Sequence, residues 1–145
     1  MITIRKSVAQ CDKENIPSQL DKALNWMKSK YPNVDFDVDF IFSGAVRNSK
    51  YYRNGEQNSN YTKPTVQIET NRDNHLIYWK PSLGITRKEV TGVGREDVTV
   101  CAIIHELTHH VQYETGLPKG EVLTTQNELE WLKEFRPDVY ELFTT

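Results

Sequence analysis

Cysteine is scarce in this sequence: only Cys11 and Cys101 occur among its 145 residues. Two thiols can form neither a disulfide framework nor a zinc site made of four thiolates. We therefore expect a protein of the reducing cytoplasm, in which Cys101 packs as a small buried hydrophobe.

Long apolar segments are also missing. No stretch approaches the roughly 20 apolar residues that a membrane-spanning helix needs, and residues 1–10 lack the apolar run of a signal peptide. The formal net charge of -2 argues against binding to nucleic acid through overall charge. With 37% hydrophobic and 26% charged residues, the chain is expected to form a single globular domain over residues 1–145, with neither a membrane nor a nucleic acid as partner.

One stretch carries recognisable chemistry: His105-Glu106-Leu107-Thr108-His109, an H-E-x-x-H pattern. On a helix, positions four apart lie on one face, so both imidazoles can reach a single metal ion. Zinc at a catalytic site takes three protein ligands and leaves one position for water, and Glu106 is the acid placed to accept the proton of that water. The alternative is a surface helix with two solvated histidines, and the sequence around the motif decides between the two.

That surrounding sequence favours an amphipathic helix over residues 96–115. The segment contains no glycine or proline, begins with two acidic residues and is followed by a Gly-Leu-Pro stop at 116–118. His110 points away from His105, so we expect it to pack or to form hydrogen bonds and not to bind the metal. The apolar residues on the side opposite to His105 predict a buried face; they are Val100, Ile103, Ile104, Leu107 and Val111.

The motif resembles the active helix of the zincin metallopeptidases, and the sequence H-E-L-T-H-x-V-Q is similar to the corresponding motif of small gluzincin-type domains. Direct identity with the motif covers only this helix. The resemblance implies one Zn²⁺ per chain bound by His105 and His109, with Glu106 as general base and a glutamate of the next helix as third ligand. Metzincins use a downstream histidine instead, and because no histidine follows His110, that branch is excluded.

The third ligand is chosen among four glutamates: Glu121, Glu128, Glu130 and Glu134. In a helix over residues 121–135, Glu128 lies in the middle of the apolar face, whereas Glu130 and Glu134 point outward. Glu121 shares the inward face but lies at the start of the helix, only a short turn after His109. We therefore predict Glu128 as the ligand, with one departure from the family: Leu132 stands where an aspartate is often found.

The rest of the sequence predicts an α+β fold. Apolar residues at helical spacing predict a helix over 18–30, and strict alternation predicts a strand over 34–42. Asp35, Asp37 and Asp39 are expected on the solvent face of that strand and not in a metal site. Residues 43–63 have the composition of a loop. Strands over 65–70 and 75–79, joined by a turn at 71–74, are expected to pair with each other as an antiparallel hairpin.

The expected architecture is therefore a minimal zincin-like domain. It has an N-terminal helix, a small mixed or antiparallel sheet of three to four strands, and two C-terminal helices that carry the metal site. By resemblance to zincins, a strand between residues 65 and 79 would be the edge strand that the substrate pairs with. Four residues of the loop are either substrate contacts or simply solvated: Tyr51, Tyr52, Arg53 and Tyr61.

Two functions from different classes are consistent with these observations. The first is a zinc-dependent peptidase that acts on a peptide or protein substrate. The second is a binding or regulatory module that keeps the zincin scaffold, and the metal with it, without turning over substrate. An electrophile that stabilises the oxyanion would separate them, and the sequence offers four candidates without a spacing argument for any: His75, Tyr113, Tyr140 and Arg136.

Overall fold

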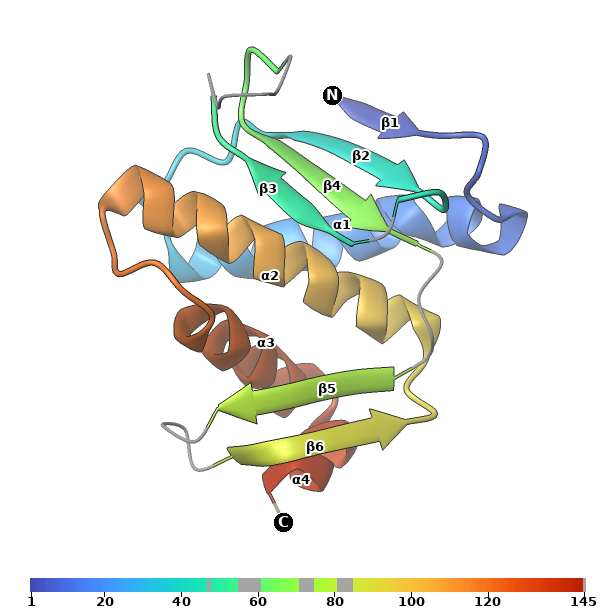
Figure 1. Ribbon diagram of the computed structural model, residues 1–145, viewed down its shortest axis with the longest axis vertical. Coiled ribbons are helices and arrows are strands. Elements are labelled where there is room, and N and C mark those ends of the chain that lie inside the picture. Colours follow the sequence, from blue (N-terminus) through green and yellow to red (C-terminus); the bar gives the residue numbers. More distant parts are fainter. Residues whose placement is uncertain (47, 55–60, 71–74, 81–84, 145) are drawn as a thin grey trace.

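The computed structural model describes residues 1–46, 48–54, 61–70, 75–80 and 85–144 and has an α+β fold (Figure 1). Within strands 75–80 and 85–91, the side chains of 75, 77–80 and 85–87 are not described. The predicted turn at 71–74, part of the predicted loop 43–63 and the side chain of His75 therefore lie outside the described residues.

Four strands form a mixed sheet in the order β1-β2-β4-β3. Strands β1 (Ile2–Ile4), β2 (Asp39–Ser43) and β4 (Thr65–Glu69) run parallel, and β3 (Lys50–Tyr52) is antiparallel to β4 at the edge. The register pairs Phe40 with Val66 and Phe42 with Ile68, and all four side chains are buried. The predicted strand 34–42 is confirmed in part: the strand begins only at Asp39, but Phe36 and Val38 just before it are buried as predicted.

The predicted hairpin between residues 65–70 and 75–79 is wrong. Strand β4 pairs with β2 and β3, while β5 (His75–Lys80) pairs with β6 (Ile85–Thr91) in a separate antiparallel sheet. Alternation of apolar and polar residues fixes which face of a strand is buried but not which strand is its neighbour. The loop prediction for residues 43–63 was also incomplete, because it missed the short strand β3.

Helix α1 (Gln10–Lys30) begins earlier than the predicted start at Ser18. Proline normally opens a helix or breaks it, but Pro17 is exposed and lies inside α1. Its neighbour Ile16 is almost fully buried on the same face as Leu20 and Met27. Packing of this face against the core extends the helix past the proline.

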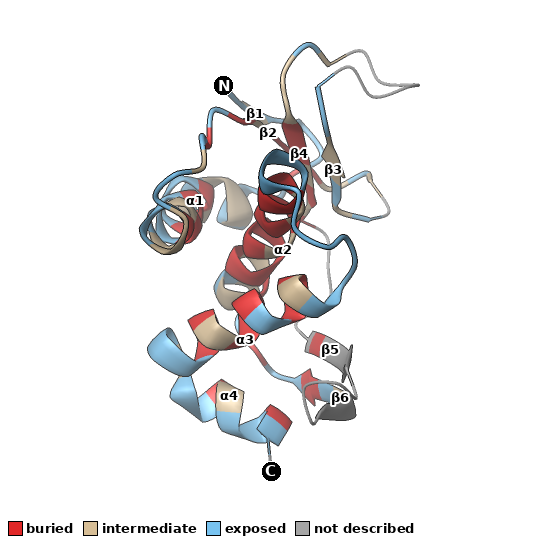
Figure 2. Ribbon diagram, turned by 90° about the vertical axis from the view of Figure 1, so that its left-hand side faces the viewer, coloured by how far each residue is buried: buried red, intermediate tan, exposed pale blue. Residues whose placement is uncertain are grey.

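Helix α2 (Arg95–Thr115) is the centre of the molecule and confirms the helix predicted over 96–115. It lies beside α1 against one face of the four-stranded sheet, and α3 (Val122–Phe135), α4 (Pro137–Thr144) and the β5–β6 hairpin lie on its other side (Figures 1 and 2). Gly116 ends α2 in a left-handed conformation with φ of 72°, which glycine adopts without strain. Among the described helices, none is long and apolar enough to span a membrane.

Candidate metal centre

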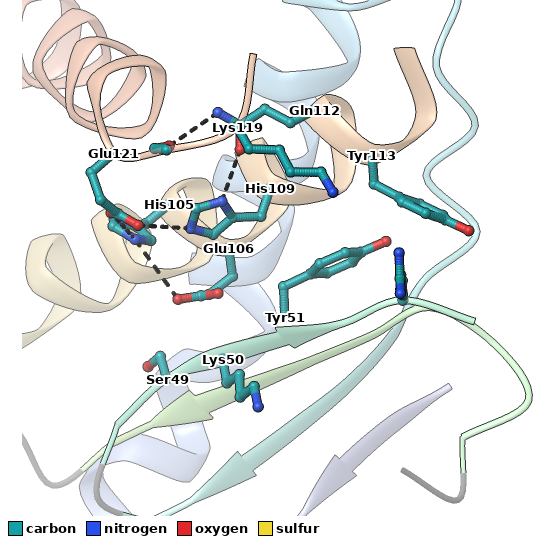
Figure 3. Close-up of a pocket in the computed structure, with 12 residues that line it drawn as sticks. Ser49, Lys50, Tyr51, His105, Glu106, His109, Gln112, Tyr113, Lys119 and Glu121 are labelled. Carbon is teal, nitrogen blue, oxygen red and sulfur yellow. Dashed lines mark hydrogen bonds and ion pairs between the residues drawn. The ribbon is translucent and has the colours of Figure 1, made fainter. Parts of the chain in front are cut away.

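The two histidines of the H-E-x-x-H motif lie one turn apart on α2, on the side that faces the connection to α3. Their ring centroids are 5.1 Å apart, and both side chains are partly exposed. The Nε2 atom of His105 lies 2.9 Å from Oε2 of Glu121, and the Nε2 atom of His109 lies 3.3 Å from Oε1 of the same carboxylate. Figure 3 shows this convergence of both rings on Glu121.

The other ring nitrogen of each histidine is held by an acceptor. Nδ1 of His105 lies 3.2 Å from Oε2 of Glu128, and Nδ1 of His109 lies 2.9 Å from Oε1 of Gln112. An acceptor at Nδ1 fixes the proton there and leaves Nε2 as the ligand atom, which is how histidines are oriented in metal sites. Both Nε2 atoms are therefore presented toward the same place.

Gln112 also fixes the position of Glu121. Its amide nitrogen donates hydrogen bonds to the backbone carbonyls of Pro118 and Gly120, at 3.0 and 3.1 Å. One side chain of α2 thus orients His109 and holds the connection that carries Glu121. In this connection Gly120 has a positive φ of 126°, a conformation that a residue with a Cβ rarely adopts.

Glu106 lies beside the two histidines and not between them. Its side chain is buried, with a relative exposure of 6%, and its Oε1 atom is 4.0 Å from Nε2 of His105. It lines the same groove as the histidines. A carboxylate in this place is outside hydrogen-bond distance of the ring but close enough to act on a molecule bound next to it.

The structure brings Glu121, and not the predicted Glu128, to the ligand nitrogens. Within the described residues, the group of acids, histidines and cysteines whose ligand atoms all lie within 4.8 Å of one another is His105, His109 and Glu121. Glu128 does face inward and is buried, as helical phase predicted, but it lies at Nδ1 of His105. The geometry therefore favours Glu121 as third ligand and gives Glu128 the role of orienting His105.

The two other candidate glutamates point away, as expected from helical phase. Glu130 pairs with Lys30, and Glu134 accepts a hydrogen bond of 3.1 Å from the indole of Trp26 on α1. Both contacts lie between α3 and α1, away from the histidines. Neither residue is placed to contribute to a metal site.

The carboxylates around the site favour positive charge at its centre. Burial opposes a charge on His105, but the hydrogen bonds that it donates to Glu121 and Glu128 outweigh this effect and raise its pKa to about 10. The hydrogen bond to Glu121 likewise raises the pKa of His109. Hydrogen bonds from both histidines hold the pKa of Glu121 well below its usual range, whereas burial raises the pKa of Glu106. A divalent cation would supply the positive charge that this arrangement stabilises.

The donor set fits zinc. Two imidazole nitrogens and one carboxylate oxygen are the protein ligands of a class of catalytic zinc sites. Calcium and magnesium prefer sites made of oxygen atoms alone, and the pair of nitrogens argues against them. The orienting acceptors at both Nδ1 atoms complete the arrangement.

The site opens into a groove of about 570 Å³. One wall is formed by edge strand β3 and its flanks, through Ser49, Tyr51 and Arg53. Strand β4 cannot be the exposed edge, because it is paired on both sides. The prediction that a strand between residues 65 and 79 borders the groove is therefore corrected for β4: among the described residues, the strand that lines the groove is β3, while the side chains of 75 and 77–79 on β5 are not described.

Tyr51 joins this edge strand to α2 through His110. The Tyr51 hydroxyl lies 2.8 Å from Nδ1 of His110, and Nε2 of His110 lies 2.7 Å from the backbone carbonyl of Asp35. The carbonyl can only accept, so Nε2 carries the proton and Nδ1 accepts from the tyrosine. His110 is 1% exposed, which confirms that it serves packing and hydrogen bonding, and Cys101 is confirmed as a buried residue of the core.

Among the four candidates for an electrophile, the structure places Tyr113 in the groove. Arg136 is paired with Asp97 and Asp138, and Tyr140 lies on α4 next to Lys133. The side chain of His75 lies outside the described residues. Tyr51, which the sequence left open, also lines the groove, and the alternation around β3 is too short to have indicated this.

The two inward glutamates should differ in their effect on metal binding. Glu128→Ala removes an orienting partner and is expected to weaken zinc affinity by about 10- to 100-fold. Glu121→Ala removes a ligand and should weaken it by more than Glu128→Ala does. Competition with a fluorescent chelator measures both, with Glu130→Ala as the matched control that leaves affinity unchanged. If Glu128→Ala lost more zinc affinity than Glu121→Ala, Glu128 would be the third ligand, as helical phase predicted.

Comparisons with known proteins found no family model, no curated protein and no solved structure that matches this chain.

Proposed function

We propose that the protein is a zinc-dependent peptidase of the zincin type, in which His105, His109 and Glu121 hold one Zn²⁺. The observation that carries this proposal is the convergence of both Nε2 atoms on the Glu121 carboxylate, with the buried Glu106 beside them in a groove bordered by an edge strand. Structural zinc sites are closed by four protein ligands, whereas catalytic sites keep an open position. An open groove and an adjacent carboxylate that is not a ligand therefore favour a catalytic site.

A zinc ion held by His105, His109 and Glu121 would supply Lewis acidity to a water molecule and to the substrate carbonyl. Glu106 would take the proton from the attacking water and deliver it to the leaving amine. Its burial beside the two histidines places this carboxylate next to the groove. Glu128 and Gln112 hold the two imidazoles in the orientation that the site requires.

Strand β3 would bind the substrate backbone. Among the described strands, β4 is its one partner, and an extended peptide would add to its other edge through backbone hydrogen bonds. Tyr51 fixes the distance between this strand and α2 through its hydrogen bond to His110. A peptide bound along β3 would lie between the strand and Glu106.

The direct test is hydrolysis of a mixed fluorogenic peptide library by the purified protein. We expect cleavage that stops when zinc is removed with a chelator and returns when about one equivalent of zinc is added. Calcium or magnesium should not restore it, because the donor set contains two nitrogens. A fully zinc-loaded protein that binds peptides but cleaves none of the library would contradict the proposal and favour a binding module built on the same scaffold.

A further inference from the structure

The groove beside the histidines carries basic side chains on both of its walls. Arg53 follows strand β3 on one wall, and Lys119 lies in the α2–α3 connection on the other. The carboxylates among the described lining residues are Glu106 and Glu121, and both face the histidines. Among the described lining residues, those away from the histidines therefore carry positive charge, although the whole chain has a formal charge of -2.

Lys119 is placed to meet a bound molecule. It is exposed, and Figure 3 shows its ammonium directed over the groove toward Tyr51 and Tyr113. It forms no ion pair with any residue that the structure describes. Lys50 also lines the groove, but Figure 3 shows its ammonium directed away from the histidines, so we assign it no part in binding a peptide.

Arg53 is positioned by an aromatic ring on the opposite wall. Its guanidinium carbon lies 5.7 Å from the ring centroid of Tyr113, within the range of a cation–π contact. Tyr113 keeps 41% of its surface exposed, so the pair forms a platform at the surface of the groove. The planar guanidinium group matches a carboxylate in shape and in charge.

We propose that this groove selects peptides that carry an acidic side chain close to the scissile bond, with Arg53 and Lys119 as the residues that determine this specificity. The inference rests on the proposed peptidase function. Opposite charges on a substrate and a binding groove raise the association rate and discriminate against substrates of the wrong charge. The two tyrosines add apolar surface on which the aliphatic part of a glutamate can pack.

Binding of two matched peptides tests the inference. The zinc-loaded Glu106→Gln protein prevents turnover, and fluorescence anisotropy then compares a glutamate-containing peptide with its glutamine counterpart. We expect the glutamate peptide to bind at least about fivefold more tightly at low ionic strength, with a preference that shrinks as salt screens the charges. In the same background Lys119→Gln and Arg53→Gln should each reduce the preference by about two- to fivefold. Lys28→Gln, which removes an exposed charge of α1 outside the groove, should leave it unchanged.

The same peptides, given to the active protein, separate this inference from the proposed function. Cleavage of both peptides at equal rates, together with equal binding, would overturn the acidic preference and leave the peptidase intact. A preference in binding that depends on Lys119 and Arg53, without cleavage of either peptide, would support the charge selectivity and overturn the peptidase. A preference that survives both substitutions would overturn the assignment of these two residues.

Discussion

Glu106→Gln should leave zinc binding at about one ion per chain while peptide hydrolysis falls by about two to four orders of magnitude. The substitution keeps the size of the side chain and its helix propensity but removes the group that accepts a proton. Glu106 is buried beside the two histidines, with its carboxylate 4.0 Å from Nε2 of His105. Its loss should therefore affect the chemical step and leave the ligands in place.

The control for this experiment is Glu114→Gln, which makes the same change at an exposed position of the same helix. We expect its zinc content and turnover to match those of the unmodified protein. Metal analysis and initial rates on one fluorogenic peptide measure both quantities for each variant. Full turnover in Glu106→Gln, or loss of its zinc, would show that Glu106 is not the general base.

His105→Ala and His109→Ala should each abolish stoichiometric zinc binding and, with it, hydrolysis. Each variant leaves two of the three converging ligands, too few for a stable catalytic zinc site. The expected loss is larger than the effect of removing an orienting acceptor such as Glu128. Zinc should also stop raising the melting temperature of these variants, because a ligand stabilises a fold only to the extent that it binds the native state.

The neighbouring histidine provides a demanding control. His110→Gln should keep zinc binding, since His110 bonds to Tyr51 and to the Asp35 carbonyl. It should lower the free energy of unfolding by about 1–3 kcal/mol, because buried hydrogen-bonding groups lose their partner. Thermal melts and metal analysis of all three variants separate the two kinds of histidine. Retention of zinc in His105→Ala or His109→Ala would place the metal elsewhere.

Helix α2 could be predicted from the sequence because its signals are local. The run without glycine or proline, the apolar face and the Gly116 stop all lie within residues 95–116, and the helix is observed over nearly the predicted range. The position of His110 away from the metal site follows from the same periodicity. Within one helix, the position of a residue in the sequence determines the direction in which its side chain points.

The position of Glu121 could not be obtained in the same way because it depends on a turn between two helices. Helical phase correctly indicated that Glu128 is buried, but two inward positions were available and phase cannot rank them. The connection is held against α2 by Gln112 and includes a positive φ at Gly120. Together these features bring Glu121 to both Nε2 atoms. Gly120 immediately before Glu121 was the signal in the sequence for so tight a turn.

The pairing of the strands could likewise not be predicted from local sequence patterns. Strands were expected over residues 34–42, 65–70 and 75–79 and are observed over 39–43, 65–69 and 75–80, but the partners of β4 were not expected. Parallel pairing of β2 with β4 depends on contacts between segments far apart in the sequence. Strand β3 has only 3 residues, too few for alternation to identify a strand that borders the candidate site.

The central claim is that His105, His109 and Glu121 together bind one zinc ion, and anomalous diffraction at the zinc edge tests it most directly. Crystals of the zinc-loaded protein should give one strong peak per chain, about 2.0–2.2 Å from Nε2 of both histidines and from a Glu121 oxygen. Glu128 should remain at Nδ1 of His105. A peak bonded to Glu128 with Glu121 turned away, or no peak between the two histidines, would contradict this claim.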